Sequence, residues 1–122
     1  MHDVITIYTD GSSICNGSPE SDCGWACLLM YNGKGLFKSG YLKGKTNNYT
    51  EMFAVLQGLK SVTNHKIPCL VRSDSQYVVK TLKKEFKVGA NEDLWSELFY
   101  EVSLFENIEF QLQAQDENGN HV

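Results

Sequence analysis

The first part of the chain alternates short apolar runs with turn residues, a pattern typical of β-strands. Strands are predicted over residues 4–10, 24–32 and 35–43. The last two are joined by Asn-Gly-Lys-Gly at residues 32–35, and Asn-Gly between two apolar runs is a strong signal for a tight hairpin. The sequence therefore predicts an antiparallel meander of three strands.

The hydrophobic period becomes helical after the third strand. Across residues 46–62, apolar side chains recur every three or four positions, which is the spacing of an amphipathic helix. A short apolar run then predicts a buried strand over residues 67–74. Two further helices are predicted over residues 75–86 and 91–106, and a last strand over residues 108–115. The predicted order of elements is therefore βββαβααβ.

This order predicts an α/β fold in a single domain over residues 1–122. Helices that cross between strands place the fourth and fifth strands parallel to the first, in a five-stranded mixed sheet with flanking helices. The length of 122 residues and the hydrophobic content of 42% fit one compact domain. No apolar run approaches the roughly 20 residues that a membrane-spanning helix needs, so we expect a soluble, cytoplasmic protein that makes no membrane contact.

Cysteines occur at positions 15, 23, 27 and 69. Cys23 and Cys27 lie four positions apart with no histidine nearby, which is neither the usual spacing nor the usual ligand set of a zinc site. We expect the cysteines to be reduced and mostly packed, as in an intracellular protein.

Charge is distributed unevenly along the chain. The net charge of -4 weighs against strong nonspecific binding to nucleic acid. However, residues 92–122 contain no Lys or Arg, whereas most of the lysines fall in two clusters in the middle of the chain. These clusters either face the phosphates of a nucleic acid or form solvated faces, and both interpretations are open. The clusters consist of Lys34, Lys38, Lys43 and Lys45, and of Lys80, Lys83, Lys84 and Lys87.

Three carboxylates fall at the ends of predicted elements. Asp10 ends the first strand and Asp74 ends the fourth. If those strands are parallel neighbours, both side chains leave the same edge of the sheet, where open α/β sheets place their sites. Glu51 lies in the first turns of the helix at residues 46–62, on the apolar stripe that faces the sheet. Carboxylates that converge repel each other, and a divalent cation such as Mg²⁺ or Mn²⁺ resolves that conflict.

Each of these acids also has a local explanation. Asp10 precedes a glycine and so could belong to a turn. Asp74 could cap the helix that follows it, and Asn48 with Glu51 could form a capping box. These explanations treat the residues one at a time and do not account for the three acids together, so we favour a metal site.

Three motifs along the chain stand in a characteristic order and spacing. They are Asp-Gly-Ser at residues 10–12 after an apolar strand, TNNYTE at residues 46–51 opening a helix, and SDSQYV at residues 73–78 between a strand and a helix. Together they resemble type 1 ribonuclease H, and DLWSELF at residues 93–99 is similar to a later helix of that family. The resemblance covers nearly the whole chain, and the combination of motifs is specific although each one alone is weak.

The resemblance implies a ribonuclease H-like fold and an endoribonuclease that hydrolyses the RNA strand of RNA/DNA hybrids by two-metal-ion catalysis. By matching positions, Asp10, Glu51 and Asp74 would be three of the four carboxylates that bind metal in the family. The implied cofactor is Mg²⁺, with Mn²⁺ as a substitute. No organic cofactor is implied, and we expect a monomer.

The resemblance also implies a surface that recognises the hybrid. RNA is told from DNA through its 2′-hydroxyl groups in the wide minor groove, and Asn16, Asn48 and Gln76 match polar positions that the family places there. Thr46 matches a position that helps to hold a DNA phosphate. A turn-forming or capping role is the open alternative for each of these residues.

A basic protrusion of bacterial members of the family has only a short counterpart here. Lys83, Lys84 and Lys87 resemble a reduced version of it, with Phe86 or Trp95 as an aromatic partner. We therefore expect weaker and more salt-sensitive binding of the hybrid than in a member with the full protrusion.

The C-terminal segment departs from the family. Gln115 stands where the family has a histidine, and glutamine forms hydrogen bonds but does not carry a proton. The final C-terminal helix, which bears the fourth carboxylate, is expected to be missing. A truncated chain, a substitute ligand in Asp116 or Glu117, and a poorly held second metal are all open, as is His121 in place of the missing base. We expect an impaired enzyme that keeps its fold.

Two other functions remain open at this point. A catalytically weakened ribonuclease H-like module that binds nucleic acid would explain Gln115, but it would not explain three intact acids. The nuclease domain of a reverse transcriptase, or a strand-transfer nuclease, would share the fold and the acids. TNNYTE and SDSQYV together favour the branch that is specific for hybrids.

Overall fold

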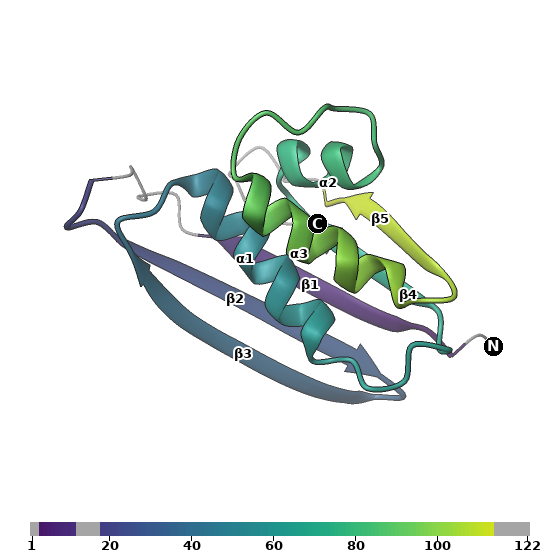
Figure 1. The fold of residues 1–122 in the computed structure, drawn as a ribbon. Coiled ribbons are helices and arrows are strands. Elements are labelled where there is room, and N and C mark those ends of the chain that lie inside the picture. The colour runs from purple at the N-terminus through teal and green to yellow at the C-terminus, as the bar shows by residue number, and fades with distance from the viewer. Residues whose placement is uncertain (1–2, 12–17, 114–122) are drawn as a thin grey trace.

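The computed structural model describes residues 3–11 and 18–113, and its elements follow the predicted order βββαβααβ (Figure 1). The strands are β1 (Ile5–Gly11), β2 (Asp22–Tyr31), β3 (Lys34–Lys43), β4 (Cys69–Ser73) and β5 (Ile108–Leu112). The helices are α1 (Asn47–Lys60), α2 (Gln76–Leu82) and α3 (Glu92–Ser103).

The strands form one five-stranded sheet in the order β3-β2-β1-β4-β5. β2 runs antiparallel to both β1 and β3, whereas β4 is parallel to β1 and β5 is parallel to β4. The hairpin between β2 and β3 turns at Asn32 and Gly33, whose φ angles are 52° and 76°. Positive φ at both positions is what a type I′ turn requires. The predicted mixed sheet, with β4 and β5 parallel to β1, is confirmed.

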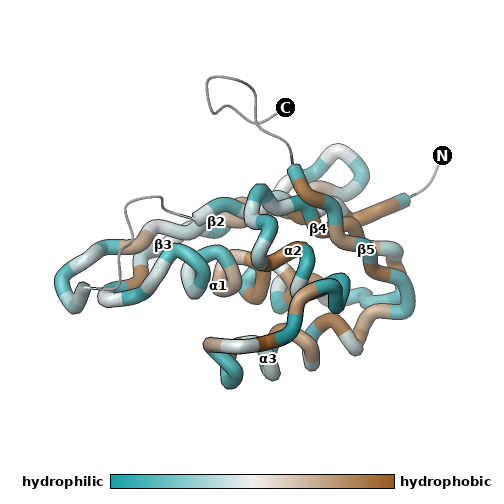
Figure 2. The backbone as a smooth tube through the Cα atoms, turned by 90° about the horizontal axis from the view of Figure 1, so that it is seen from above, coloured by the Kyte–Doolittle hydropathy of each residue, from teal (hydrophilic) through white to brown (hydrophobic). Residues whose placement is uncertain are grey.

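The hydrophobic core lies between the sheet and α1. This helix packs against β1 and β2, and α3 packs against α1 on the same side of the sheet (Figures 1 and 2). Gly58 permits the close approach of helix and strand, because a Cβ atom there would lie 2.6 Å from Cγ2 of Ile7. Val55 and Leu59 are fully buried, so the stripe that begins at Glu51 faces the sheet as predicted.

The second helix is shorter than expected. α2 ends at Leu82 rather than at residue 86. Lys84 has a φ of 65°, and a residue in the left-handed conformation ends a helix. Residues 83–90, which we call the basic loop, are all exposed. Lys83 and Lys84 thus lie on this loop instead of the predicted helix, together with Lys87.

The cysteines differ from the expectation at one position. Cys27 and Cys69 are free and buried, and burial raises the pKa of Cys69 to about 12. Cys23 is disulfide-bonded, so the expectation of reduced cysteines is wrong for this residue. The spacing of cysteines along a sequence does not reveal which of them the fold brings together. Cys15 lies outside the described residues.

Several expectations fall on residues that the structure does not describe. These are the substrate role of Asn16 and the roles of Gln115, Asp116, Glu117 and His121. The expectation of a missing final helix concerns the same end of the chain. Within residues 3–11 and 18–113, none of the helices combines the length and the hydrophobicity needed to cross a bilayer.

Candidate active site

Three carboxylates meet where β1 and β4 end. These strands are parallel neighbours, with Thr9 paired to Ser73, so Asp10 and Asp74 leave the sheet at the same edge. Glu51 reaches this edge from the first turns of α1. One carboxylate oxygen from each of the three acids lies within 4.8 Å of the others. The structure thus brings together the three acids, and their role as metal ligands stays a prediction.

Neighbouring residues, and not these acids, cap the two helices. Ser75 is the N-cap of α2, and its hydroxyl accepts a backbone N–H of the first turn at 3.2 Å. Thr46 is the N-cap of α1 and accepts a backbone N–H at 3.2 Å in the same way. The alternatives in which Asp74 caps α2, and Asn48 with Glu51 forms a capping box, are therefore wrong. Local capping does not explain why the acids converge.

The electrostatics of this cluster centre on Glu51. Burial, followed by the charges of Asp74 and Asp10, raises the pKa of Glu51 to about 8. Hydrogen bonding from the backbone N–H of Gly11 lowers the pKa of Glu51, whereas side-chain hydrogen bonding with Asp74 raises it. Asp10 is exposed and Asp74 is partly exposed. The cluster therefore holds a proton on Glu51 at neutral pH unless a cation takes its place.

The donor set of the cluster fits a divalent cation. Oε2 of Glu51 is buried and has no hydrogen-bond partner among the described residues. Leaving a buried polar atom unpaired costs about 1–3 kcal/mol, and a cation bound to this oxygen would remove that penalty. Carboxylate oxygens are hard ligands, which Mg²⁺ and Mn²⁺ prefer. Asp10, Glu51 and Asp74 can therefore hold a divalent metal ion.

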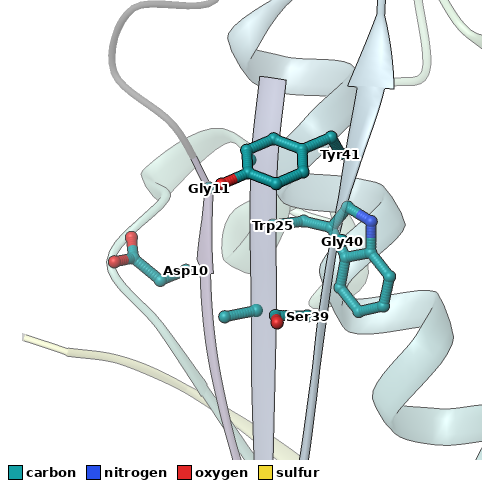
Figure 3. A pocket seen from close by; sticks show the side chains of 8 residues that line it. Asp10, Gly11, Trp25, Ser39, Gly40 and Tyr41 are labelled. Carbon is teal, nitrogen blue, oxygen red and sulfur yellow. The ribbon is translucent and has the colours of Figure 1, made fainter. Parts of the chain in front are cut away.

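A surface pocket gives access to the cluster from solvent. It has a volume of about 250 Å³ and is lined by residues of β1, β2 and β3. Figure 3 shows Asp10 at one side of this pocket and the rings of Trp25 and Tyr41 at the other. The Tyr41 side chain is 81% exposed. Asp10 is therefore accessible to a molecule that approaches over the open end of the sheet.

Comparison with known proteins now identifies the family. The family model for RNase H matches residues 2–118. The chain belongs to the ribonuclease H family. It is 39% identical to a ribonuclease H of Thermoanaerobacter sp. (strain X514), with 79% of this chain and 68% of that protein covered. It is 32% identical to a ribonuclease H of Chlorobium limicola (strain DSM 245), with 97% and 88% covered.

Solved structures show the same ribonuclease H fold. LC11-RNase H1 in complex with an RNA/DNA hybrid aligns with a TM-score of 0.72 at 23% identity, over 88% of this chain and 83% of that chain. An N-terminal RNase H domain from Mycobacterium tuberculosis aligns with a TM-score of 0.78 at 22% identity, over 89% and 81%. The predicted ribonuclease H-like fold is therefore confirmed.

A second cavity gathers several of the substrate residues expected for a ribonuclease H. It has a volume of about 460 Å³ and lies between the start of α1 and the basic loop. Thr46, Asn48 and Lys87 line it together. Gln76 is exposed at the start of α2 and does not line this cavity. Thr46 caps α1, which was the alternative to its expected role in binding the substrate. It also lines the cavity, so it could contact a substrate as well.

The same cavity contains residues that sequence reasoning missed. Tyr77 and Asn91 line it beside Lys87. Tyr77 lies within the SDSQYV motif, of which only Asp74 and Gln76 were predicted as site residues. Asn91 gave a weaker signal: it has a φ of 57° at the N-cap of α3, and asparagine is one of the few residues that readily adopts that conformation.

Trp95 does not lie on the substrate-binding surface. Its side chain is 1% exposed, and its Nε1–H donates to the Tyr77 hydroxyl at 3.0 Å. The expectation of Trp95 as an aromatic partner of the lysines is therefore wrong, because the apolar face of α3 buries it against α1. Phe86, the other candidate, is 46% exposed, with the Lys80 ammonium 5.6 Å from the centroid of its ring.

Proposed function

We propose that this chain is an endoribonuclease that hydrolyses the RNA strand of RNA/DNA hybrids, using divalent metal held by Asp10, Glu51 and Asp74. The observation that carries the proposal is the convergence of these acids around a buried, unpartnered Glu51 oxygen. Membership of the ribonuclease H family supports the reaction class. The hybrid bound by LC11-RNase H1, which shares the fold, supports the substrate.

The three acids have distinct parts in this proposal. When bound, divalent ions would supply charge stabilisation at the phosphate and an activated water. Asp10 is the most exposed of the three, so it would be the first of them to meet an approaching phosphate or ion. Glu51, which extends from α1, would give up its proton on binding an ion, because its pKa is raised to about 8. Asp74 completes the ligand set from β4. We propose Mg²⁺ as the natural ion and Mn²⁺ as a substitute.

Substrate recognition is proposed for the cavity between the start of α1 and the basic loop. Thr46, Asn48 and Lys87 offer two polar side chains and a cation in one place, which suits a sugar-phosphate backbone. Lys83 and Lys84 extend the positive charge along the exposed basic loop. Discrimination of RNA through its 2′-hydroxyl groups is proposed for Asn16, Asn48 and Gln76.

The proposal takes residues 1–122 as a single domain that works as a cytoplasmic monomer without an organic cofactor. The one continuous sheet of the described residues supports a single domain. A nuclease domain within a reverse transcriptase has the same fold, as a foamy viral protease-reverse transcriptase with a TM-score of 0.74 illustrates. The hybrid-cleavage experiment below does not depend on which of these proteins the chain comes from.

The test is cleavage of an end-labelled RNA strand paired to DNA, in Mg²⁺ and then in Mn²⁺. The controls are an Asp10→Asn variant and an RNA/RNA duplex. We expect cleavage of the hybrid alone, and its loss in Asp10→Asn. Binding of the hybrid without cleavage in either metal would instead identify a nucleic-acid-binding module.

A further inference from the structure

Gly11, the last residue of β1, is a glycine for a reason other than backbone conformation. Among the described glycines, positive φ angles occur at Gly33 and Gly44 but not at Gly11. Gly11 has ordinary strand geometry and pairs with Trp25 of β2. An L-residue such as alanine adopts this backbone without strain. The missing side chain must therefore matter through the space that it leaves.

Glu51 occupies that space. A Cβ atom built on Gly11 would lie 2.7 Å from Oε1, 2.9 Å from Cδ and 3.2 Å from Cγ of Glu51. These are the three heavy atoms nearest to it, so the conflict is with this side chain and not with the backbone. A methyl group at position 11 would push the Glu51 carboxylate away from the end of β1.

The backbone of Gly11 also holds the carboxylate in place. Its backbone N–H faces the Glu51 carboxylate, and hydrogen bonding from Gly11 lowers the pKa of that group and so favours its charged form. The helix that carries Glu51 has little freedom to follow a displaced carboxylate, because Thr50 and Met52 on either side of Glu51 are fully buried. The side chain would have to rotate instead, away from Asp10 and Asp74.

We infer that Gly11 is a positioning residue of the metal site: its lack of a side chain and its N–H together fix the Glu51 carboxylate against Asp10 and Asp74. The inference rests on the proposed function, since it assumes that these acids bind a divalent ion. Gly11 acts through Glu51: it leaves room for Oε1 of that carboxylate, whereas Oε2 is buried without a hydrogen-bond partner among the described residues.

Other glycines of the chain provide matched controls. At Gly24 on β2, an added Cβ would have its nearest neighbour at 3.6 Å, an ordinary contact with the Tyr41 ring. At Gly58, an added Cβ would meet Ile7 in the core, away from the carboxylates. Gly24→Ala therefore tests the addition of a methyl group to a strand, and Gly58→Ala tests destabilisation through a contact that does not involve the Glu51 side chain.

The experiment is titration of Mn²⁺ into the full chain by calorimetry, with thermal unfolding of the same samples. Replacing a residue that supports a metal ligand weakens affinity roughly 10- to 100-fold, and we expect a loss of that size in Gly11→Ala. Gly24→Ala should bind Mn²⁺ as the parent protein does. Gly58→Ala should lower the melting temperature, and a Glu51→Ala background should not restore it, because the contact that it strains is with Ile7.

A second variant separates positioning from folding. In a Glu51→Ala background, Gly11→Ala should weaken Mn²⁺ binding no further, because the side chain that it displaces is gone. If Gly11→Ala alone unfolds early, Glu51→Ala should restore the melting temperature for the same reason. Unchanged Mn²⁺ affinity in Gly11→Ala, or an equal additional loss in the Glu51→Ala background, would overturn the inference. A parent protein that binds no Mn²⁺ would overturn the proposed metal site, and this inference with it.

Discussion

The carboxylate cluster and the basic loop are opposite in construction. The cluster joins residues of β1 and α1 with the residue that follows β4, and these are far apart in the sequence. Its Glu51 is partly buried. The basic loop is one contiguous segment, residues 83–90, and all of it is exposed. One region is fixed by the fold, whereas the other extends from it into solvent.

Because of this difference, we expect the cluster to determine the rate of cleavage and the basic loop to contribute to the affinity for the hybrid. A metal site works only if its ligands keep their geometry, so it belongs on rigid elements. Attraction of a phosphate backbone depends on charge and tolerates small displacements, so it can reside on a loop. Changes in the cluster should therefore produce large losses of rate that salt does not alter. Changes in the basic loop should produce moderate losses of affinity that depend on salt.

The largest effect is expected from Glu51→Gln. Since replacing a residue that merely supports a metal ligand costs about 10- to 100-fold, loss of the ligand itself should lower hybrid cleavage by more than roughly 100-fold. The metal-free variant should unfold no earlier than the parent protein, because Glu51 is protonated there at neutral pH. Glu109→Gln, on the exposed side of β5, is the control. Near-normal cleavage by Glu51→Gln would remove Glu51 from the metal site.

The pH dependence of metal binding should be the next largest effect. Because burial, then Asp74 and Asp10, raise the pKa of Glu51 to about 8, an ion that binds below this pH must displace a proton. Mn²⁺ affinity should then rise by up to about tenfold per pH unit as the pH approaches 8, and level off above it. Calorimetry in buffers of different ionisation enthalpy measures the released proton.

The stability of the metal-free protein should change in the opposite direction. A carboxyl group whose pKa is higher in the folded state than in the unfolded state binds a proton on folding at intermediate pH. Its contribution to stability is therefore lost as the pH rises toward about 8. Melting temperatures across this range should fall for the parent protein and fall less for Glu51→Gln. Equal slopes for the two proteins would contradict the assignment of the proton to Glu51.

A smaller, salt-dependent effect is expected from the basic loop. Replacing Lys83, Lys84 and Lys87 together by alanine should weaken hybrid binding roughly tenfold at low salt, and the salt slope should fall by about one for each lysine that contacts a phosphate. The cleavage rate at saturating hybrid should stay unchanged. The control is a double variant of Lys60 and Lys66, two exposed lysines outside the loop, compared with a double variant of Lys83 and Lys84 so that the change in charge is the same. An equal loss in that variant would show that only net charge matters.

The contrast between buried and exposed regions also explains which parts of the fold and of the site could be predicted from the sequence. The order of elements, the sheet and the meeting of Asp10 with Asp74 followed from hydrophobic period and from the rules of strand connection. Glu51 could be added because the stripe that it begins faces the sheet. These inferences hold because they depend on the buried face of each element, and the buried face is visible in the sequence.

What the sequence could not predict depends on contacts between segments that are distant along the chain. Tyr77 and Asn91 join Lys87 in one cavity only because α2, the basic loop and α3 fold around it. The steric role of Gly11 requires the position of the Glu51 carboxylate. The end of α2 at Leu82 depends on the left-handed conformation of Lys84, and lysine at that position carries no turn signal.

The smallest effect is expected from Trp95→Phe, which tests where the binding surface ends. The variant loses the hydrogen bond from Nε1 to the Tyr77 hydroxyl and part of a buried side chain, so the free energy of unfolding should fall by about 1–2 kcal/mol. Hybrid affinity should not change, because the indole is 1% exposed.

Phe86→Ala should behave in the opposite way, since its ring is 46% exposed on the basic loop: stability should hold and hybrid affinity should fall a fewfold at most. Chemical denaturation and hybrid titration of both variants make the comparison. A loss of affinity in Trp95→Phe without a loss of stability would place the indole on the substrate side of α3, and the division between a rigid catalytic region and an exposed binding loop would then fail at that helix.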